Sequence, residues 1–337
     1  HVIGDPATGT LWAAGGGAWE GAGVWRSTDG GESWTLARLA RGGREDWIAA
    51  NPEEAAEFGA APAPPAPFDG EIDALWSLAF AHGRLYAGAK PANLYVSEDG
   101  GAGWARMAGL AEYPGREAWW PGGAGLTLHT ILTSPEDPAK LWVGISAAGI
   151  FASEDGGVSW APRIRRANAG PGGEAEIGTC VHNMVRADVA GRDLLYQQNH
   201  AGVFRSPDGG RSWTEITEGL PSNFGFPVSV HPRAPETLWV FPLNGDSAGR
   251  FPPDASAAVW RSRDGGESWT AQGAGLPAKN CYFTVLRQAM ATDPADPPGL
   301  FFGTNSGSVF ASFDEGAAWH PIAEHLPTIL SVETLAP

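Results

Sequence analysis

The chain has 337 residues and a formal net charge of −16, with 47 glycines, 28 prolines and 16 tryptophans. Disordered chains are poor in aromatic residues, so this composition predicts a globular protein with many turns between short strands. The acidic charge argues against nucleic acid and anionic membrane surfaces as partners, and no apolar run approaches the roughly 20 residues needed to span a bilayer.

One motif, Ser-x-Asp-x-Gly-x-x-Trp, organises the chain. Its aspartates are spaced by 70, 56, 53, 56 and 50 residues, and the last copy has Glu315 in place of its first glycine. Asp accepts hydrogen bonds from turn N–H groups, Gly supplies positive φ, and Trp covers the hairpin with apolar surface. The six aspartates are Asp29, Asp99, Asp155, Asp208, Asp264 and Asp314.

Short apolar runs before each motif predict strands, which we group by their distance from it. The nearest group covers residues 23–26, 93–96, 149–152, 202–205, 258–261 and 308–311. The next covers 11–15, 85–88, 141–144, 195–197, 238–240 and 300–303, and the innermost covers 75–79, 128–132, 181–185, 227–230, 283–286 and 330–334. With a fourth strand opened by each motif's Trp, the unit is a four-stranded antiparallel propeller blade.

These repeats resemble the Asp-box (BNR) family of sialidase-like propellers. The stretches 142–149, 196–200, 243–246 and 286–290 are similar to bacterial proteins labelled BNR-repeat glycosyl hydrolases or exo-α-sialidases. The resemblance implies that the boxes are structural turns remote from the catalytic face. It also implies an additional N-terminal segment, so we expect an all-β propeller of seven-bladed type with a truncated closing blade, and a six-bladed ring is the competing count.

We expect one domain over residues 1–337, with a Pro/Ala-rich loop inserted at 40–72 between the first two blades. Only two cysteines occur, Cys180 and Cys281, which is no disulfide framework and fits a reducing compartment. The N-terminus starts at His1 and has no signal-peptide character. These features favour a cytoplasmic monomer, although a missing upstream segment leaves export open.

Polar residues that the blade alignment brings to the central mouth are the candidate ligand-binding residues. Trp76, His129, His182, Pro227 and Phe283 fall at matching inner-strand positions. The loops joining second to third strands contain Lys90, Ser146, Asn199, His200, Asn244, Asp246 and Asn305. We expect both sets to converge on one face, where propellers commonly place their sites.

Three neutral imidazoles, of His129, His182 and His200, could hold Zn²⁺ or another divalent cofactor while leaving a position for water. The alternative is that they are hydrogen-bonded residues filling the channel. Cys180 lies two residues before His182 and is either half of a Cys–His nucleophile pair or an incidental thiol.

A sialidase would need three arginines around a carboxylate, a Tyr nucleophile and an acidic proton donor. Tyr282 is the candidate nucleophile, Arg250 and Arg287 face an anionic group in this hypothesis, and Asp246 is the acidic residue. Glu174 or Glu176 is the candidate second carboxylate of a glycosidase. The first several inner strands carry no Arg, which speaks against the sialidase pattern, and Tyr282 is alternatively a core or rim residue.

The function therefore stays open between three classes. The first is a carbohydrate-acting hydrolase of sialidase-like ancestry. The second is a non-catalytic propeller that binds a small ligand or a protein, with Trp119 and Trp120 either stacking on a sugar or packing in the core. The third is a metal-dependent enzyme built on the three histidines.

Overall fold

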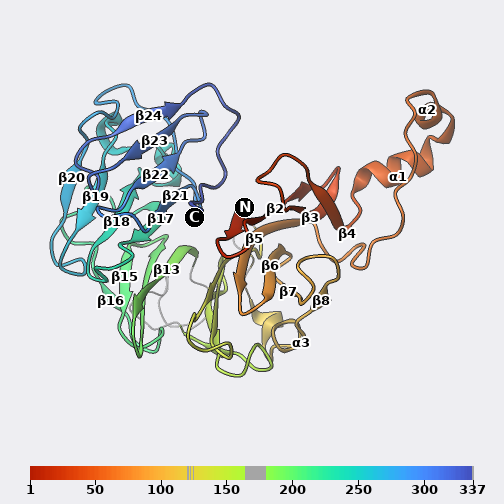
Figure 1. Cartoon of the computed structure of the whole chain (residues 1–337), viewed down its shortest axis with the longest axis horizontal. Helices are drawn as coiled ribbons and strands as arrows, with labels where there is room; N and C mark the ends of the chain where they lie inside the picture. The colour runs from red at the N-terminus through yellow and green to blue at the C-terminus, as the bar shows by residue number, and fades with distance from the viewer. Residues whose placement is uncertain (120, 122, 124, 164–179, 336–337) are drawn as a thin grey trace.

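The computed structural model describes residues 1–119, 121, 123, 125–163 and 180–335. Their strands form six four-stranded antiparallel sheets, each in sequence order from the inside outward, arranged around a common centre (Figure 1). The first three blades are β1 (Val2–Asp5), β2 (Thr10–Gly17), β3 (Gly21–Ser27) and β4 (Thr35–Ala40); β5 (Ala74–Ala81), β6 (Arg84–Lys90), β7 (Leu94–Ser97) and β8 (Ala105–Arg106); and β9 (Leu128–Thr133), β10 (Leu141–Ile145), β11 (Gly149–Ser153) and β12 (Ala161–Pro162).

The other three blades repeat this plan. They are β13 (Val181–Val189), β14 (Arg192–Asn199), β15 (Val203–Ser206) and β16 (Thr214–Glu215); β17 (Gly225–Val230), β18 (Leu238–Pro242), β19 (Val259–Ser262) and β20 (Thr270–Gln272); and β21 (Met290–Thr292), β22 (Leu300–Gly303), β23 (Val309–Ser312) and β24 (His320–Ala323). The all-β propeller is confirmed, with the six-bladed count.

Two predicted inner strands are wrong. Residues 283–286 form no strand, because their backbone binds loop groups instead: Thr284 N–H donates to Asn305 Oδ1 at 2.7 Å, and blade six begins at Met290. The 330–334 segment makes one isolated parallel bridge, between Gln288 and Ser331, rather than a strand of a seventh blade. It lies where the two chain ends meet, and Ser331 Oγ accepts the Val2 N–H at 3.1 Å (Figure 1).

The buried apolar side chains of the described residues form five clusters, and each fills the space between two consecutive blades. Tyr95 of blade two packs with Trp12 of blade one, and Phe302 of blade six packs with Trp239 and Phe241 of blade five. Because second strands are covered on both faces, they include continuous apolar runs such as Leu141–Ile145, whose five residues are all buried.

Tryptophans on the second strand of alternate blades tie each blade to the Asp-box of the next. The indole N–H of Trp12 donates to Gly100 O at 2.9 Å, that of Trp142 to Gly209 O at 3.0 Å and that of Trp239 to Glu315 O at 3.2 Å. Glu315 adopts a φ of 58°, the left-handed conformation that glycine supplies in the other boxes. The boxes therefore also serve as acceptors for the neighbouring blade.

All six boxes have the same internal hydrogen bonds. In the first, Ser27 Oγ donates to Asp29 Oδ1 at 2.8 Å and accepts the Gly31 N–H at 2.9 Å, while Asp29 Oδ1 accepts the Ser33 N–H at 3.0 Å. Hydrogen bonds from Ser268 and Ser262 likewise lower the pKa of Asp264 to about 2. The box aspartates are thus ionised turn-forming residues.

We expect this turn to be acid-labile. Because the pKa of Asp264 falls from 3.8 to about 2 on folding, its carboxylate stabilises the fold above the unfolded pKa and ceases to do so as pH falls through about 2. Asp264→Asn should unfold at a lower temperature than the parent at pH 6, and the difference should shrink between about pH 4 and pH 2. Asp188→Asn, on the exposed tip of the β13–β14 hairpin, is the control, and a gap independent of pH would contradict the expectation.

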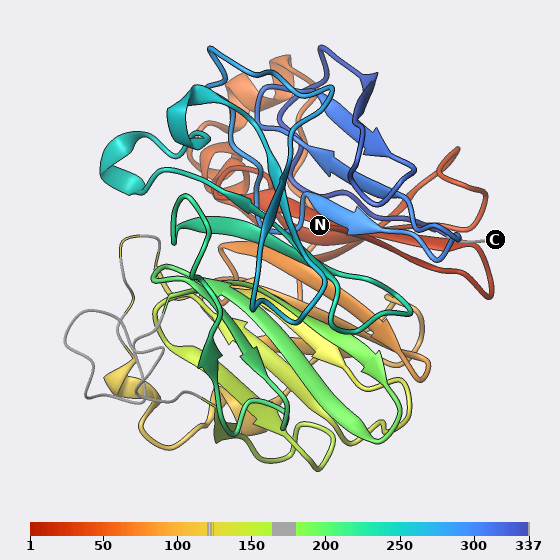
Figure 2. The same ribbon diagram turned by 90° about the vertical axis from the view of Figure 1, so that its left-hand side faces the viewer.

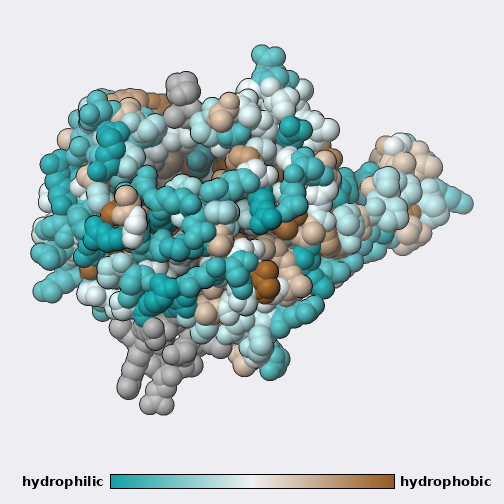
Figure 3. All heavy atoms as spheres, turned by 60° about the horizontal axis from the view of Figure 1, so that its bottom comes forward, coloured by the Kyte–Doolittle hydropathy of each residue, from teal (hydrophilic) through white to brown (hydrophobic). Residues whose placement is uncertain are grey.

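The 40–72 segment projects from the ring and carries two short helices, α1 (Gly43–Ala50) and α2 (Pro52–Glu57) (Figures 1 and 3). Its Pro/Ala stretch, residues 61–66, is irregular. Asp69 fastens the returning end to blade one by accepting both the N–H and the Nε–H of Arg41 at 2.7 Å. The other short helices in the described ranges are α3 (Ala108–Ala111), η1 (Arg116–Ala118), η3 (Asp246–Ala248) and η4 (Pro253–Ala255). None of the helices in the described ranges is long and apolar enough to cross a membrane.

Candidate functional site at the propeller mouth

Strand register separates the two ends of the ring. At one end, the first residue of an inner strand pairs with the last residue of the second strand, as Ala74 does with Lys90. At the other end, the start of the second strand pairs with the end of the third strand, as Leu85 does with Ser97, and the box begins there. The loops joining second to third strands therefore share an end with the inner-strand starts, which we call the mouth. Figure 2 shows the long loop that carries η3 and η4 projecting from this end.

Inner strands of three blades are bulged at the same position at the mouth. The register skips Trp76 in β5, His129 in β9 and His182 in β13. A β-bulge re-aims the side chain of the unpaired residue, and bulges are frequent beside active sites. The sequence alignment of these three positions is thus confirmed; in β17 the skipped residues are Phe226 and Pro227.

His182 is the best-anchored polar side chain at the mouth. It is buried, its Nδ1 lies 2.6 Å from Gly225 O, and its ring contacts His200 and Phe226 at centroid distances of 5.4 and 4.9 Å. Because a carbonyl only accepts, Nδ1 carries the proton and Nε2 holds the lone pair of the neutral ring. Burial and the charge of Arg287 lower the pKa of His182 to about 3, so the imidazole is neutral.

The carboxylate of Asp246 lies at the half-exposed rim of the mouth, between the His200 ring and the Arg250 guanidinium. Asp246 Oδ2 lies 3.9 Å from His200 Nε2, and Asp246 Oδ1 accepts a hydrogen bond from Arg250 Nε. Burial tends to raise the pKa of Asp246, but the hydrogen bond and charge of Arg250 outweigh it and hold that pKa below the ordinary value. Asp246 is therefore an ionised carboxylate paired with Arg250.

Arg287 connects this rim to a central cavity. Its guanidinium lies 4.8 Å from the Phe226 ring centroid, and Arg250 also faces that ring, at 5.7 Å. Arg287 lines a cavity of about 320 Å³ together with Trp76 and Leu286. Tyr282 is 66% exposed and touches Phe251, so it is a rim residue and not part of the core.

His129 lies apart from the cluster of His182 and His200. It lines a second, smaller cavity of about 200 Å³ deeper in the channel, with Thr130 and Asn183, and its Nε2 has no hydrogen-bond partner among the described residues. Burial, with the charge of Arg287, lowers its pKa well below the ordinary value. The cluster of ligand atoms at the mouth instead joins Cys180 with His182 and His200.

Several predicted ligand-binding residues shape the loops around the mouth. Asn199 Oδ1 accepts the N–H groups of Ala201 and Gly202 at 2.7 and 3.0 Å, and Asn305 holds Thr284 as described above. The Asn244 N–H donates to Phe251 O at 2.8 Å and thereby closes the η3 loop, while Lys90 O accepts the Asp73 N–H at 2.7 Å.

Of the aromatic pair predicted as a sugar platform, Trp119 is buried. It packs on Phe151 with ring centroids 4.9 Å apart, which makes it a core residue. Trp120, Glu174 and Glu176 lie outside the described residues.

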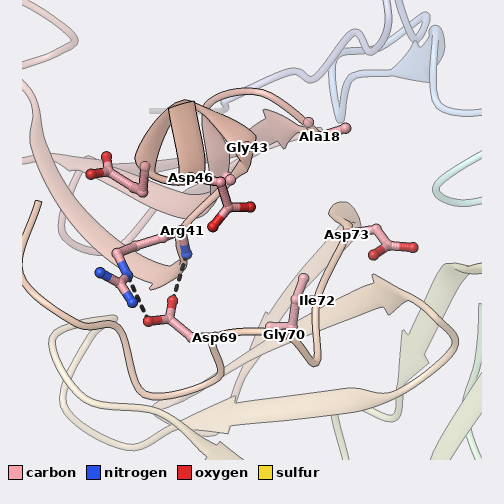
Figure 4. A pocket seen from close by; sticks show the side chains of 12 residues that line it. Ala18, Arg41, Gly43, Asp46, Asp69, Gly70, Ile72 and Asp73 are labelled. Carbon is pink, nitrogen blue, oxygen red and sulfur yellow. Dashed lines mark hydrogen bonds and ion pairs between the residues drawn. The ribbon is translucent and has the colours of Figure 1, made fainter. Parts of the chain in front are cut away.

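A cavity of about 310 Å³ lies apart from the mouth cluster, at the base of the insertion (Figure 4). Asp46 and Asp73 line it from opposite sides, and the Arg41–Asp69 pair forms one wall. Its acidic lining has one cation, already paired with Asp69, so it offers little to an anionic ligand.

No protein-family model matches the chain. It is 25% identical over 223 residues, 56% of this chain and 26% of the other, to an oligoxyloglucan-reducing end-specific xyloglucanase of Emericella nidulans. The fold is similar to the GH74 xyloglucanase of Xanthomonas campestris, with a TM-score of 0.65 at 20% identity over 96% of this chain and 47% of that one. YCF48 bound to D1 peptide is also similar, with a TM-score of 0.55 at 13% identity over 93% of this chain and 77% of that chain. The chain thus spans about a quarter of its curated relative and less than half of the Xanthomonas enzyme.

Proposed function

We propose that this propeller acts on carbohydrate and binds a xyloglucan-type oligosaccharide at its mouth. The observation that carries the proposal is the 25% identity to a xyloglucanase over 223 residues. The relatives reported above include xyloglucanases and no sialidase, so the sialidase specificity implied by the family resemblance has no support from them.

The chemistry of the mouth is compatible with a neutral glycan. Sugar rings stack on exposed aromatic faces, and Tyr282 offers one beside the η3 loop. Hydroxyl groups need donors and acceptors, which Asp246, His200 and Arg250 provide at the half-exposed rim.

In this proposal Asp246 is also the ionised carboxylate that a hydrolytic reaction requires, and Arg250 keeps it in that form. A glycosidase needs a second carboxylate, and the candidates from the sequence, Glu174 and Glu176, lie in the segment that the structure does not describe. Oligosaccharide binding is therefore the primary claim, and hydrolysis at Asp246 is the secondary one.

Isothermal titration calorimetry with xyloglucan oligosaccharides, cello-oligosaccharides and sialyllactose tests the primary claim. We expect binding of the xyloglucan oligosaccharides and a loss of roughly tenfold in affinity in Tyr282→Ala. The matched control is Phe313→Ala, a similarly exposed aromatic residue inside the sixth box, on the opposite end of the ring. Binding of sialyllactose alone would favour the sialidase alternative, and absence of binding to any of the three glycans would contradict the proposal.

A further inference from the structure

Three side chains at the mouth place thiol and imidazole ligands close together. Cys180, just before β13, His182 on β13 and His200, just after β14, each offer one ligand atom, and these atoms lie within 4.8 Å of one another. Around a tetrahedral zinc ion with bonds of about 2.0–2.3 Å, neighbouring ligand atoms are about 3.5 Å apart. A contraction of about 1 Å in side-chain positions would therefore close the cluster on an ion.

His182 already has the arrangement of a metal-binding histidine. Its Nδ1–H donates to Gly225 O at 2.6 Å, which fixes the ring and leaves Nε2 with a free lone pair. Metal-ligating histidines almost always donate their second N–H to a carbonyl or carboxylate in this way. Since β13 is bulged at His182, the backbone aims this ring out of the ladder.

The two other ligands are held by the same strand pair. His200 N–H donates to Cys180 O at 3.1 Å, so the backbone joins the two residues directly. Ser146 Oγ lies 3.4 Å from Cys180 Sγ, within hydrogen-bond distance of it.

One thiolate and two imidazoles are a donor set of intermediate softness, which suits zinc among the abundant divalent ions. Three protein ligands leave the fourth tetrahedral position for water or a ligand. His200, half exposed and 3.9 Å from Asp246, lies at the solvent side of the cluster.

We propose that Cys180, His182 and His200 form a mononuclear Zn²⁺ site at the mouth of the propeller. The site differs from the three-histidine set expected from the sequence, with Cys180 in the place of His129. It goes beyond the proposed oligosaccharide binding and shares His200 with it, but it does not rest on that proposal, because zinc binding and glycan binding are measured separately.

Zinc content and cobalt spectroscopy test the site. After equilibration with ZnCl₂ and dialysis, we expect about one zinc per chain by mass spectrometry. Replacement by Co²⁺ should give a near-ultraviolet thiolate-to-cobalt charge-transfer band, which a histidine-only site cannot produce. Cys180→Ser should abolish that band and weaken zinc binding by more than roughly 100-fold, since even the loss of an outer partner costs 10–100-fold.

The chain offers a matched control for each ligand. Cys281→Ala removes the other thiol, which is buried in the core cluster of blades five and six, and His320→Ala removes an exposed histidine on β24. Both should retain the zinc and the cobalt band. His200→Ala, at a half-exposed position that tolerates truncation, is the second test variant, and thermal unfolding verifies that each variant is folded. Zinc binding equal in parent, Cys180→Ser and His200→Ala, or a cobalt spectrum without the thiolate band, would overturn the proposal.

Discussion

Trp239→Ala is expected to lower the free energy of unfolding by about 3–5 kcal/mol. Trp239 is fully buried between blades five and six, its ring stacks on His231 at 6.0 Å, and its N–H donates to Glu315 O at 3.2 Å. Truncation leaves a large cavity at one interface of the ring and removes one of two hydrogen bonds to Glu315 O, which also accepts from Arg261 Nη1 at 3.1 Å. Urea unfolding followed by circular dichroism measures the change.

The control for this substitution is Trp34→Ala. Trp34 is 41% exposed and donates within its own box, to Gly31 O, so it does not join two blades in this way. We expect a distinctly smaller loss of stability from it. Equal losses of stability in the two variants would show that the contacts of Trp239 between blades five and six stabilise the fold no more than those of Trp34 within its own box.

Asp246→Asn is expected to reduce the hydrolysis of xyloglucan oligosaccharides by about 10²–10⁴-fold. The amide keeps the shape of the side chain but cannot accept a proton, and it loses the charge that pairs with Arg250. Because Asp246 is half exposed, thermal unfolding should change little. Release of reducing ends, measured with parent and variant at equal concentration, gives the ratio.

Asp254→Asn is the matched control, because Asp254 is an exposed aspartate of the same loop whose left-handed backbone conformation asparagine also tolerates. It should retain the parent rate. Equal rates in Asp246→Asn and the parent would remove Asp246 from catalysis. A parent chain that binds the oligosaccharide without cleaving it would limit the proposed function to binding.

Most of the fold could be predicted from the sequence, since the Asp-box is a local structure. Ser27, Asp29 and Gly31 lie within five residues and satisfy one another's hydrogen bonds, so the same turn recurs wherever those residue types recur. The strands next to each box follow from it. The prediction was wrong at 283–286, where apolar residues such as Phe283 suggested a strand but the loop group Asn305 binds the backbone.

The site was predictable only in part, because it depends on contacts between blades. The alignment of His182 with His129 was right in register, since the repeat period fixes which inner-strand residues correspond. Phe226, which lies beneath Arg287, was passed over in favour of its neighbour Pro227. The run Gly225-Phe226-Pro227 was the sequence signal for Phe226, because the bulge there leaves both Phe226 and Pro227 out of the strand pairing.

By itself, the sequence determined the propeller, its blade period and the structural role of the six box aspartates, because these depend on groups a few residues apart. Only the tertiary structure decided the number of blades and the grouping of Cys180 with His182 and His200 in place of His129. The physical reason is that bulges and loop-to-strand hydrogen bonds, such as that from His182 to Gly225, set where side chains of different blades meet.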